Sequence, residues 1–181
     1  MWLWIGIDVD KEYLKTKDKI IEVMDKVGFD KTLLTLPFHV SLKMSFLIDD
    51  KDYNKVTKVI KDTLIKTKPF IVRVKGKEVM PNIIWARYFE NIQLNKIHDE
   101  LNKVLLNEFN IPLHEYDLDY KFHTTLFMDD DINKVSKASL LTNDLILPKR
   151  CKVNRFLIGA SSNGELGTYK VLETLDIKWG K

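Results

Sequence analysis

The chain has 181 residues, of which 45% are hydrophobic and 30% are charged. This balance is typical of a globular protein and excludes a disordered or fibrous chain. Lysine and arginine number 29 against 26 acidic residues, which gives a net charge of +3. Because positive and negative residues alternate along most of the chain, the charge permits an anionic ligand but does not form the concentrated basic face of a strong nucleic-acid binder.

Cysteine and histidine usage disfavours a metal centre. The one cysteine, Cys151, excludes a disulfide framework and a thiolate zinc site, and the four histidines lack metal-ligand spacing. We therefore expect no metal and no cofactor. The apolar segment 1–8 carries no cationic leader and is soon followed by aspartate, so a signal peptide or membrane span is not expected. The sequence predicts a buried strand there, in a cytoplasmic protein without membrane contact.

Hydrophobic periodicity predicts the remaining elements of the first half. Apolar residues at helical spacing predict a helix over 12–27, which Gly28 closes as a left-handed cap. Residues 38–46 alternate strictly between apolar and polar side chains, as in a strand with one buried face. A helix with apolar positions over 53–64 follows, and Pro69 ends it before strands over 70–74 and 83–89.

The second half repeats this order. Asn91 precedes a helix that ends before Pro112, and residues 122–128 repeat the alternation of the earlier motif strand. A short helix over 131–139 leads into strands around 152–159 and 168–175. Both halves show a motif strand, a helix and a strand, which indicates a duplication. No stretch is long and flexible enough to be a linker, so we expect a single domain over residues 1–181.

Each alternating strand carries a histidine two residues before a hydroxyl residue. The pairs are His39 with Ser41 and His123 with Thr125. Residues i and i+2 of a strand share a face, so each imidazole lies beside a hydroxyl. An imidazole has an unperturbed pKa of about 6.5, so one histidine can act as a base while the other donates a proton. The hydroxyls can bind non-bridging phosphate oxygens, and the pattern therefore predicts metal-independent cleavage of a phosphodiester.

The segments Phe38-His39-Val40-Ser41-Leu42 and Phe122-His123-Thr124-Thr125-Leu126 resemble the two H-x-[ST]-h signatures of the 2H phosphoesterases. The most similar branch in size and layout includes bacterial 2′-5′ RNA ligase-like proteins and 2′,3′-cyclic phosphodiesterases. The resemblance covers nearly the whole chain. It implies an α+β, bilobal, duplicated fold, in which two antiparallel-rich sheets with flanking helices surround a central cleft and each sheet contributes one motif strand.

Four further residues are candidate substrate contacts. Lys43 follows the first motif on the same predicted strand face, where its ammonium can meet a phosphate, although an exposed strand lysine needs no function. Trp85 and Arg87 share one strand face and can stack on a base and hold a phosphate, with core packing as the alternative for Trp85. Tyr169 resembles the aromatic residue that family members often place near the phosphate from the last hairpin. Its structural alternative is to cover the sheet.

The favoured function is hydrolysis of a 2′,3′-cyclic phosphate or a 2′-5′ bond in a nucleotide or RNA end, with His39 and His123 as acid and base. The sequence does not fix which histidine has which role. Family members with ligase-like activity commonly carry an arginine after the second motif, where this chain has Leu126-Phe127-Met128, so 2′-5′ RNA ligation ranks lower. A non-catalytic module that binds a nucleotide or RNA end is the other alternative. We expect a monomer, because the duplication supplies both halves of the site.

Overall fold

A computed structural model describes residues 1–178 of the chain. Over these residues the chain forms eight strands, four α-helices and three short 3-10 segments. The strands are β1 (Trp2–Asp8), β2 (His39–Leu47), β3 (Phe70–Met80), β4 (Ile83–Tyr88), β5 (His123–Met128), β6 (Arg150–Val153), β7 (Arg155–Ser161) and β8 (Lys170–Asp176). The helical elements are α1 (Asp10–Val27), η1 (Lys31–Thr35), η2 (Asp50–Asp52), α2 (Tyr53–Leu64), α3 (Ile92–Phe109), η3 (Glu115–Asp117) and α4 (Ile132–Leu141).

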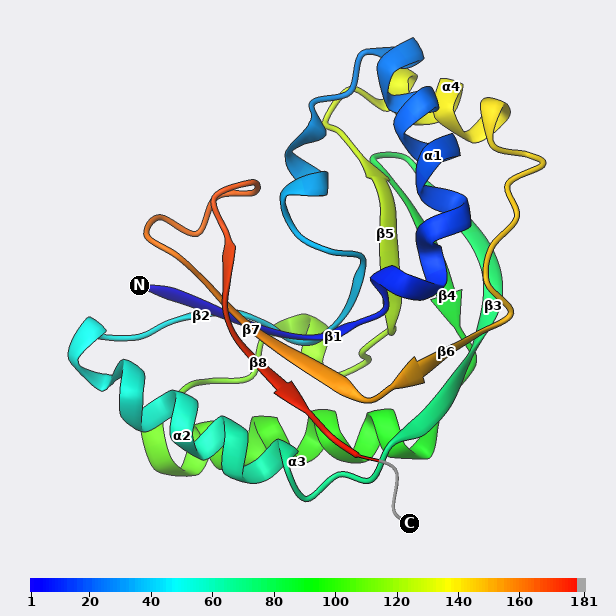
Figure 1. Cartoon of the computed structure of the whole chain (residues 1–181). Coiled ribbons are helices and arrows are strands. Elements are labelled where there is room, and N and C mark those ends of the chain that lie inside the picture. The colour runs from blue at the N-terminus through cyan, green and yellow to red at the C-terminus, as the bar shows by residue number, and fades with distance from the viewer. Residues whose placement is uncertain (179–181) are drawn as a thin grey trace.

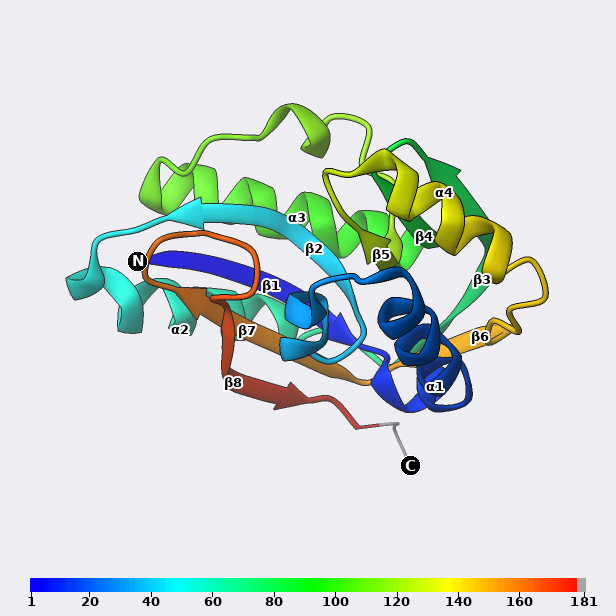
Figure 2. The ribbon, with the colours of Figure 1, turned by 90° about the horizontal axis from the view of Figure 1, so that it is seen from above.

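The strands form two antiparallel sheets with the orders β2-β1-β7-β8 and β5-β4-β3-β6. The two sheets lie beside each other in both Figure 1 and Figure 2. The two motif strands, β2 and β5, are each an edge strand of their sheet, and they contact each other where the sheets meet. The α+β fold with two antiparallel sheets is therefore confirmed, and the topology brings the two motifs together.

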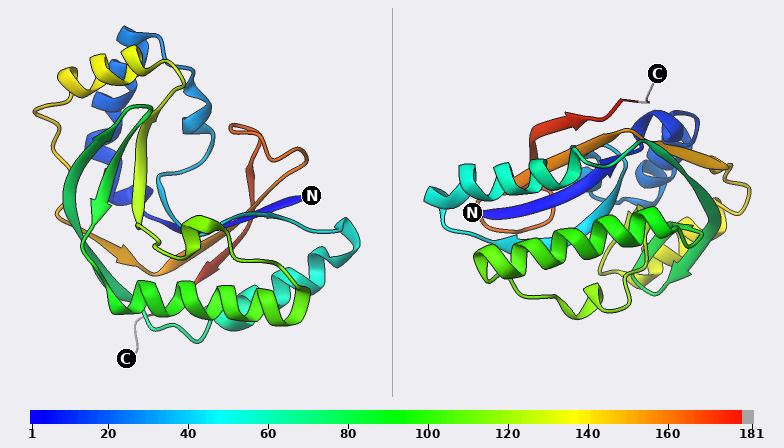
Figure 3. Two further views of the ribbon diagram at one scale, coloured as in Figure 1. Left: turned by 180° about the vertical axis from the view of Figure 1, so that it is seen from behind. Right: turned by 90° about the horizontal axis from the view of Figure 1, so that it is seen from below.

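The helices are exchanged between the two halves of the chain. The order strand, helix, motif strand, helix occurs twice, as β1-α1-β2-α2 and β4-α3-β5-α4. Yet α1 contacts β5 and β6 of the second sheet, whereas α3 contacts β2 of the first. Figures 1 and 3 show α1 beside α4 over the second sheet, and α2 beside α3 over the first. Each sheet is thus covered by a helix from the other half, and the buried hydrophobic residues form one cluster.

Local signals set the helix boundaries as the sequence predicts. Gly28 ends α1 in the left-handed conformation, with φ of 82°, and its N–H donates to the Met24 carbonyl. The side chain of Asn91 accepts hydrogen bonds from two backbone N–H groups of the first turn of α3. One strand prediction is wrong: the region 152–159 is divided at Asn154 between β6 and β7, which belong to different sheets.

The strict alternation predicted for the motif strands fails in both. The register of β2 against β1 shifts by one residue at Leu42 and once more between Lys43 and Phe46, and that of β5 against β4 shifts at Leu126. A bulge of this kind places two consecutive side chains on one face. Lys43 and Phe127, which follow the two leucines, are accordingly buried together with them. The same irregularity at the same place in both strands extends the duplication beyond the four motif residues.

Candidate functional site

His39 and His123 begin their strands in the same way. Nδ1 of His39 lies 2.8 Å from the Pro37 carbonyl, and Nδ1 of His123 lies 2.6 Å from the Lys121 carbonyl. Because a carbonyl oxygen only accepts, Nδ1 is the protonated nitrogen of each ring. Nε2 is then the atom at which each imidazole takes up or releases a proton during a reaction.

Each sheet also packs a tryptophan against its histidine. The rings of Trp4 and His39 meet edge to face, with centroids 4.4 Å apart and an interplanar angle of 69°. The rings of Trp85 and His123 have centroids 4.0 Å apart and an angle of 36°. Trp4 lies on β1 and Trp85 on β4, the strands next to the two motif strands. These contacts orient the imidazoles and remove part of each ring from water.

The motif hydroxyls lie on the same strand faces as the histidines. Ser41 Oγ accepts a hydrogen bond of 3.0 Å from Nε1 of Trp4, which leaves its own hydrogen free to be donated. Thr125 is half-buried and lies opposite Trp85 in the pairing of β4 with β5. Both hydroxyls therefore keep the placement beside an imidazole that the i, i+2 spacing predicts.

The charges around the two histidines are opposite in sign. Asp8 lies across from His39 in the β1–β2 pairing, and Arg87 lies across from His123 in the β4–β5 pairing. Nε of Arg87 is 3.2 Å from a carboxylate oxygen of Glu78, which also accepts a hydrogen bond of 3.1 Å from Trp85. The guanidinium is thereby held beside His123.

These surroundings shift the pKa of both imidazoles. Burial lowers the pKa of His39 below its usual value, while the Pro37 carbonyl and the charge of Asp8 act in the opposite direction. Burial lowers the pKa of His123 to about 4, against the hydrogen bond to the Lys121 carbonyl; Arg87 and His39 add to the lowering.

The family model described as "AKAP7 2'5' RNA ligase-like domain" matches residues 5–174 of the chain. The chain belongs to this family. It thus falls within the 2H phosphoesterases that its paired motifs resemble. An RNA 2′,3′-cyclic phosphodiesterase of Thermotoga maritima is 25% identical over 99% of this chain and 97% of that protein.

Several solved structures share the fold of this 2′-5′ RNA ligase-like domain over nearly its whole length. E. coli LigT complexed with 3′-AMP is 15% identical with a TM-score of 0.59, over 97% of this chain and 96% of that one. A protein of Thermus thermophilus is 16% identical with a TM-score of 0.61, and both chains are covered completely. At these identities the structural similarity establishes the shared fold.

Lys43 does not lie on the strand face that the sequence predicts for it. The bulge at Leu42 turns Lys43 away from the face of His39 and Ser41, and the residue is only 1% exposed. Its ammonium forms a buried ion pair with Asp117. The expectation that Lys43 shares a face with the histidine and meets a phosphate is therefore wrong, because strict alternation does not continue past the motif.

Tyr169 lies apart from the other candidates. It immediately precedes β8, which is three strands from β2 in the first sheet, or about 14 Å at the usual spacing of strands. Its hydroxyl is buried and has no hydrogen-bond partner among residues 1–178. The placement of Tyr169 near a phosphate therefore stays a prediction.

The remaining histidines have structural surroundings. His98 is 4% exposed, and its ring nitrogens contact Asp117 and Asn102. His114 is exposed and caps η3 by accepting a hydrogen bond from the N–H of Tyr116. Within residues 1–178, no group of three or more potential metal ligands gathers. In the same range, no helix has both the length and the apolar character needed to cross a bilayer.

The sequence did not single out Trp4, Asp8 or Glu78. Trp4 and Asp8 come from β1 and lie beside the first motif only through the pairing of β1 with β2, whereas Glu78 comes from β3 and lies across from Trp85. The one available signal for Trp4 was an aromatic residue in the strand that precedes each motif, since Trp85 has that place in the second half. Asp8 and Glu78 carried no signal, because exposed acids at strand ends are common.

Proposed function

We propose that the chain is a phosphodiesterase that hydrolyses a 2′,3′-cyclic phosphate or a 2′-5′ bond in a nucleotide or at an RNA end. The observation that carries this proposal is the matched presentation of His39 and His123. Both are held through Nδ1, both have a hydroxyl residue on the same face, and both lie on strands that contact each other. The name of the Thermotoga maritima relative supports the same reaction.

The unequal charges favour different roles for the two histidines. Arg87 beside His123 favours the neutral imidazole, which suits a general base; Asp8 beside His39 favours the protonated ring, which suits a general acid. In this assignment Nε2 of His123 takes a proton from the attacking water as its oxygen bonds to phosphorus. The bond between phosphorus and the ribose oxygen breaks, and Nε2 of His39 gives that oxygen a proton.

Neutral and cationic donors complete the site. Ser41 and Thr125 donate hydrogen bonds to the non-bridging oxygens, which bear the charge of the transition state. Arg87 contributes a guanidinium from β4, whereas the segment after the second motif, Leu126-Phe127-Met128, lacks the arginine that ligase-like members commonly carry there. Trp85 offers a ring face close to His123 on which a base can stack. Hydrolysis ranks above ligation because that arginine after the second motif is missing.

We also propose that residues 1–181 act as one domain and as a monomer. The exchange of α1 and α3 between the halves supports this view, since each sheet would lose one of its two covering helices without the other half. The single buried thiol of Cys151 suits a reducing compartment such as the cytoplasm.

The experiment is hydrolysis of the four nucleoside 2′,3′-cyclic monophosphates and of a 2′-5′-linked dinucleotide, in the presence of EDTA. Separation of the 2′ and 3′ monophosphate products reveals which ribose oxygen leaves. Turnover that persists in EDTA supports the proposal. Failure to cleave either substrate class, combined with weakened nucleotide binding in the His39→Ala variant, would instead favour the non-catalytic binding module.

A further inference from the structure

The face of the second sheet that carries the second motif continues beyond the motif. Tyr88 on β4 turns toward α1, since its hydroxyl lies 3.1 Å from that of Tyr13. Arg87 and Phe89 flank Tyr88 in the sequence and therefore lie on the opposite face, where Arg87 is across from His123. The left panel of Figure 3 shows β3 and β4 from this side, with α1 behind them. The face is open at the end of β4, because Phe89 is 45% exposed.

Two arginines lie side by side on this face. Arg73 on β3 pairs directly with Arg150 on β6, and both side chains are exposed, whereas Val72 and Cys151 are buried on the other face. Directly opposite residues of an antiparallel pair have Cβ atoms about 4.5–5.5 Å apart. Phe89 continues the row: its N–H donates to the Arg73 carbonyl at 2.9 Å, and the Arg73 guanidinium lies 5.0 Å from the centre of its ring. We call Phe89, Arg73 and Arg150 the arginine row.

The two guanidiniums of the arginine row lack the acidic partners that the other arginines have. Of the four arginines in the chain, Arg87 pairs with a carboxylate of β3 and Arg155 with one of β8. Within residues 1–178, Arg73 and Arg150 form no ion pair with a carboxylate. Like charges directly opposite each other destabilise a sheet. An anion bound between them relieves this repulsion, and a phosphate suits two guanidiniums because each can donate two parallel hydrogen bonds to it.

The arginine row begins close to the second motif. Phe89 is two residues after Arg87, which lies across from His123, so the row is about 7 Å from the motif along β4. Arg73 and Arg150 lie on the next two strands, at further steps of about 4.8 Å. A phosphate held by the two motif histidines cannot also lie between these arginines. A ligand that occupies both places needs a second phosphate.

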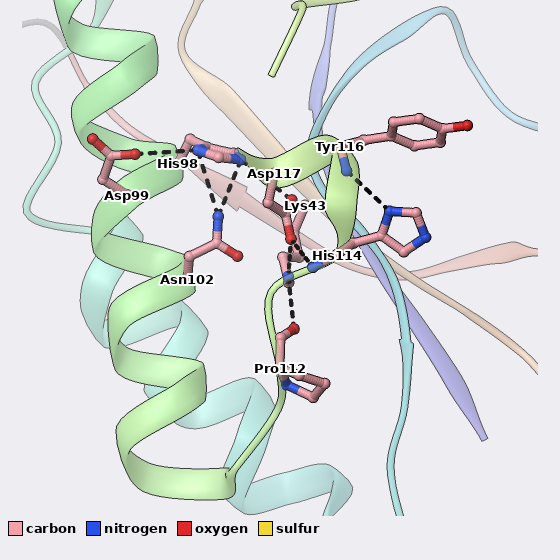
Figure 4. Close-up of polar contacts among 8 residues, drawn as sticks. All are labelled: Lys43, His98, Asp99, Asn102, Pro112, His114, Tyr116 and Asp117. Carbon is pink, nitrogen blue, oxygen red and sulfur yellow. Dashed lines mark hydrogen bonds and ion pairs between the residues drawn. The ribbon is translucent and has the colours of Figure 1, made fainter. Parts of the chain in front are cut away.

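Acidic residues limit the direction that an anionic chain can take from the motif. Between the arginine row and α3, a surface hollow is bordered by four acidic residues and one arginine. One of the acids, Asp117, forms a buried pair with Lys43, as Figure 4 shows, and the others are Glu90, Asp99 and Asp119. Their charge repels phosphates from the hollow. An anionic chain is therefore directed across β3 and β6 instead.

We propose that the arginine row binds the backbone of a single-stranded RNA whose 3′ end, with a 2′,3′-cyclic phosphate, lies at the two motif histidines. Arg73 and Arg150 hold a backbone phosphate upstream of the reacting one, and Phe89 offers a ring on which a base can stack. The inference rests on the proposed phosphodiesterase function and names its substrate class. An oligonucleotide is preferred to a cyclic mononucleotide, which has no second phosphate.

The first test compares kcat/KM for adenosine 2′,3′-cyclic monophosphate with that for an RNA tetranucleotide that ends in a 2′,3′-cyclic phosphate. Arg73→Gln and Arg150→Gln should each lower the value for the RNA about fivefold and change that for the mononucleotide less than about twofold. Lys58→Gln is the control, since it removes one exposed positive charge from α2, beside the other sheet. Equal losses for both substrates, or no loss for the RNA, would overturn the proposal.

The second test measures binding without turnover. Fluorescence anisotropy follows the same tetranucleotide with a 3′-phosphate end at several salt concentrations. A contact to one phosphate of a single strand contributes about 0.7 to the slope of log affinity against log salt, so Arg73→Gln combined with Arg150→Gln should reduce the slope by about 0.7. Phe89→Ala should weaken binding about five- to hundredfold with the slope unchanged, because stacking carries no charge. An unchanged slope in the arginine variant would refute the phosphate contact.

Arg73→Glu separates the role of the arginine row from damage to the fold. A glutamate opposite Arg150 replaces repulsion by attraction, so the midpoint of urea denaturation should rise while RNA binding weakens. A lower midpoint, or RNA binding equal to that of the wild type, would contradict the proposal. A wild type that binds the RNA without cleaving it refutes the phosphodiesterase, whereas binding by these variants still decides the role of the arginine row. Absence of RNA binding by the wild type overturns that role even if the cyclic mononucleotide is cleaved.

Discussion

Trp4 donates its indole N–H to the hydroxyl of Ser41 at 3.0 Å, from the strand that pairs with the first motif strand. The bond uses one acceptor position of Ser41 and leaves its hydrogen for a phosphate oxygen. Because backbone hydrogen bonds fix β1 against β2, the hydroxyl is oriented before a ligand arrives. The same indole packs against His39, so one residue outside the motif orients both of its functional groups.

The Trp4→Phe variant should lower kcat/KM about fivefold, the value of one neutral hydrogen bond of about 1 kcal/mol. The phenyl ring can still pack near His39, so the loss reports on the N–H donor. The control is Trp2→Phe on the same strand, since Trp2 packs against Gly164 in the β7–β8 hairpin. Steady-state kinetics of both variants checks the prediction, and equal activities would contradict it.

Gly6→Ala should displace the Trp4 ring and so disturb the hydrogen bond between Trp4 and Ser41. A Cβ at Gly6 would lie 2.3 Å from an atom of the Trp4 indole, so the ring must move. We expect a loss of about 1–3 kcal/mol in the free energy of unfolding and a larger loss of activity than in Trp4→Phe. Urea denaturation measures the first effect. The double variant with Trp4→Phe lacks the clashing ring atoms and should recover stability; no recovery would assign the cost to the backbone instead.

Asp8→Asn should move the alkaline limb of the pH profile of kcat/KM to lower pH. Asp8 raises the pKa of His39, so removal of its charge lowers this pKa. If His39 is the acid that must be protonated, the alkaline limb of kcat/KM moves to lower pH. Asp176→Asn is the control, because Asp176 also pairs with Arg155 but carries no charge that acts on His39. A shift of the acidic limb alone would reverse the assigned roles.

His123 should make the fold sensitive to acid. Its pKa is about 4 in the folded protein and about 6.5 in an unfolded chain. Between these values the unfolded state binds more protons, so His123 contributes stability above about pH 6.5 that is lost as the pH falls toward 4. His123→Gln should therefore show a smaller decrease in the free energy of unfolding between about pH 7 and 4.5. His114→Gln, at an exposed position, should behave as the wild type does; the same decrease in all three proteins would refute the prediction.

Short-range patterns were enough to predict the helices and the two motif strands. The cap at Gly28, the Asn91 side chain and the i, i+2 placement of Ser41 and Thr125 all follow from neighbours in sequence. The errors arose where the conformation of a strand depends on the strand with which it pairs. The bulge at Leu42 depends on the register against β1, and it turned Lys43 from the expected phosphate contact into a buried partner of Asp117.

Long-range pairing also explains what the sequence could not reveal about the site. Asp8 and Trp4 are each far in sequence from the motif residue beside which they lie, and neither belongs to a recognisable motif. The exchange of α1 and α3 is equally invisible, since an amphipathic helix shows that it covers a sheet but not which one. The division at Asn154 likewise depends on which sheet each strand joins.

The most direct measurement is the turnover of adenosine 2′,3′-cyclic monophosphate by the wild type, by His39→Ala, by His123→Ala and by the double variant. Loss of either acid or base should lower kcat by about a hundred- to ten-thousandfold. Because the two imidazoles act in one reaction step, the double variant should fall well short of the product of the single losses. Wild-type turnover in either single variant, with the fold intact by circular dichroism, would contradict the two-histidine mechanism.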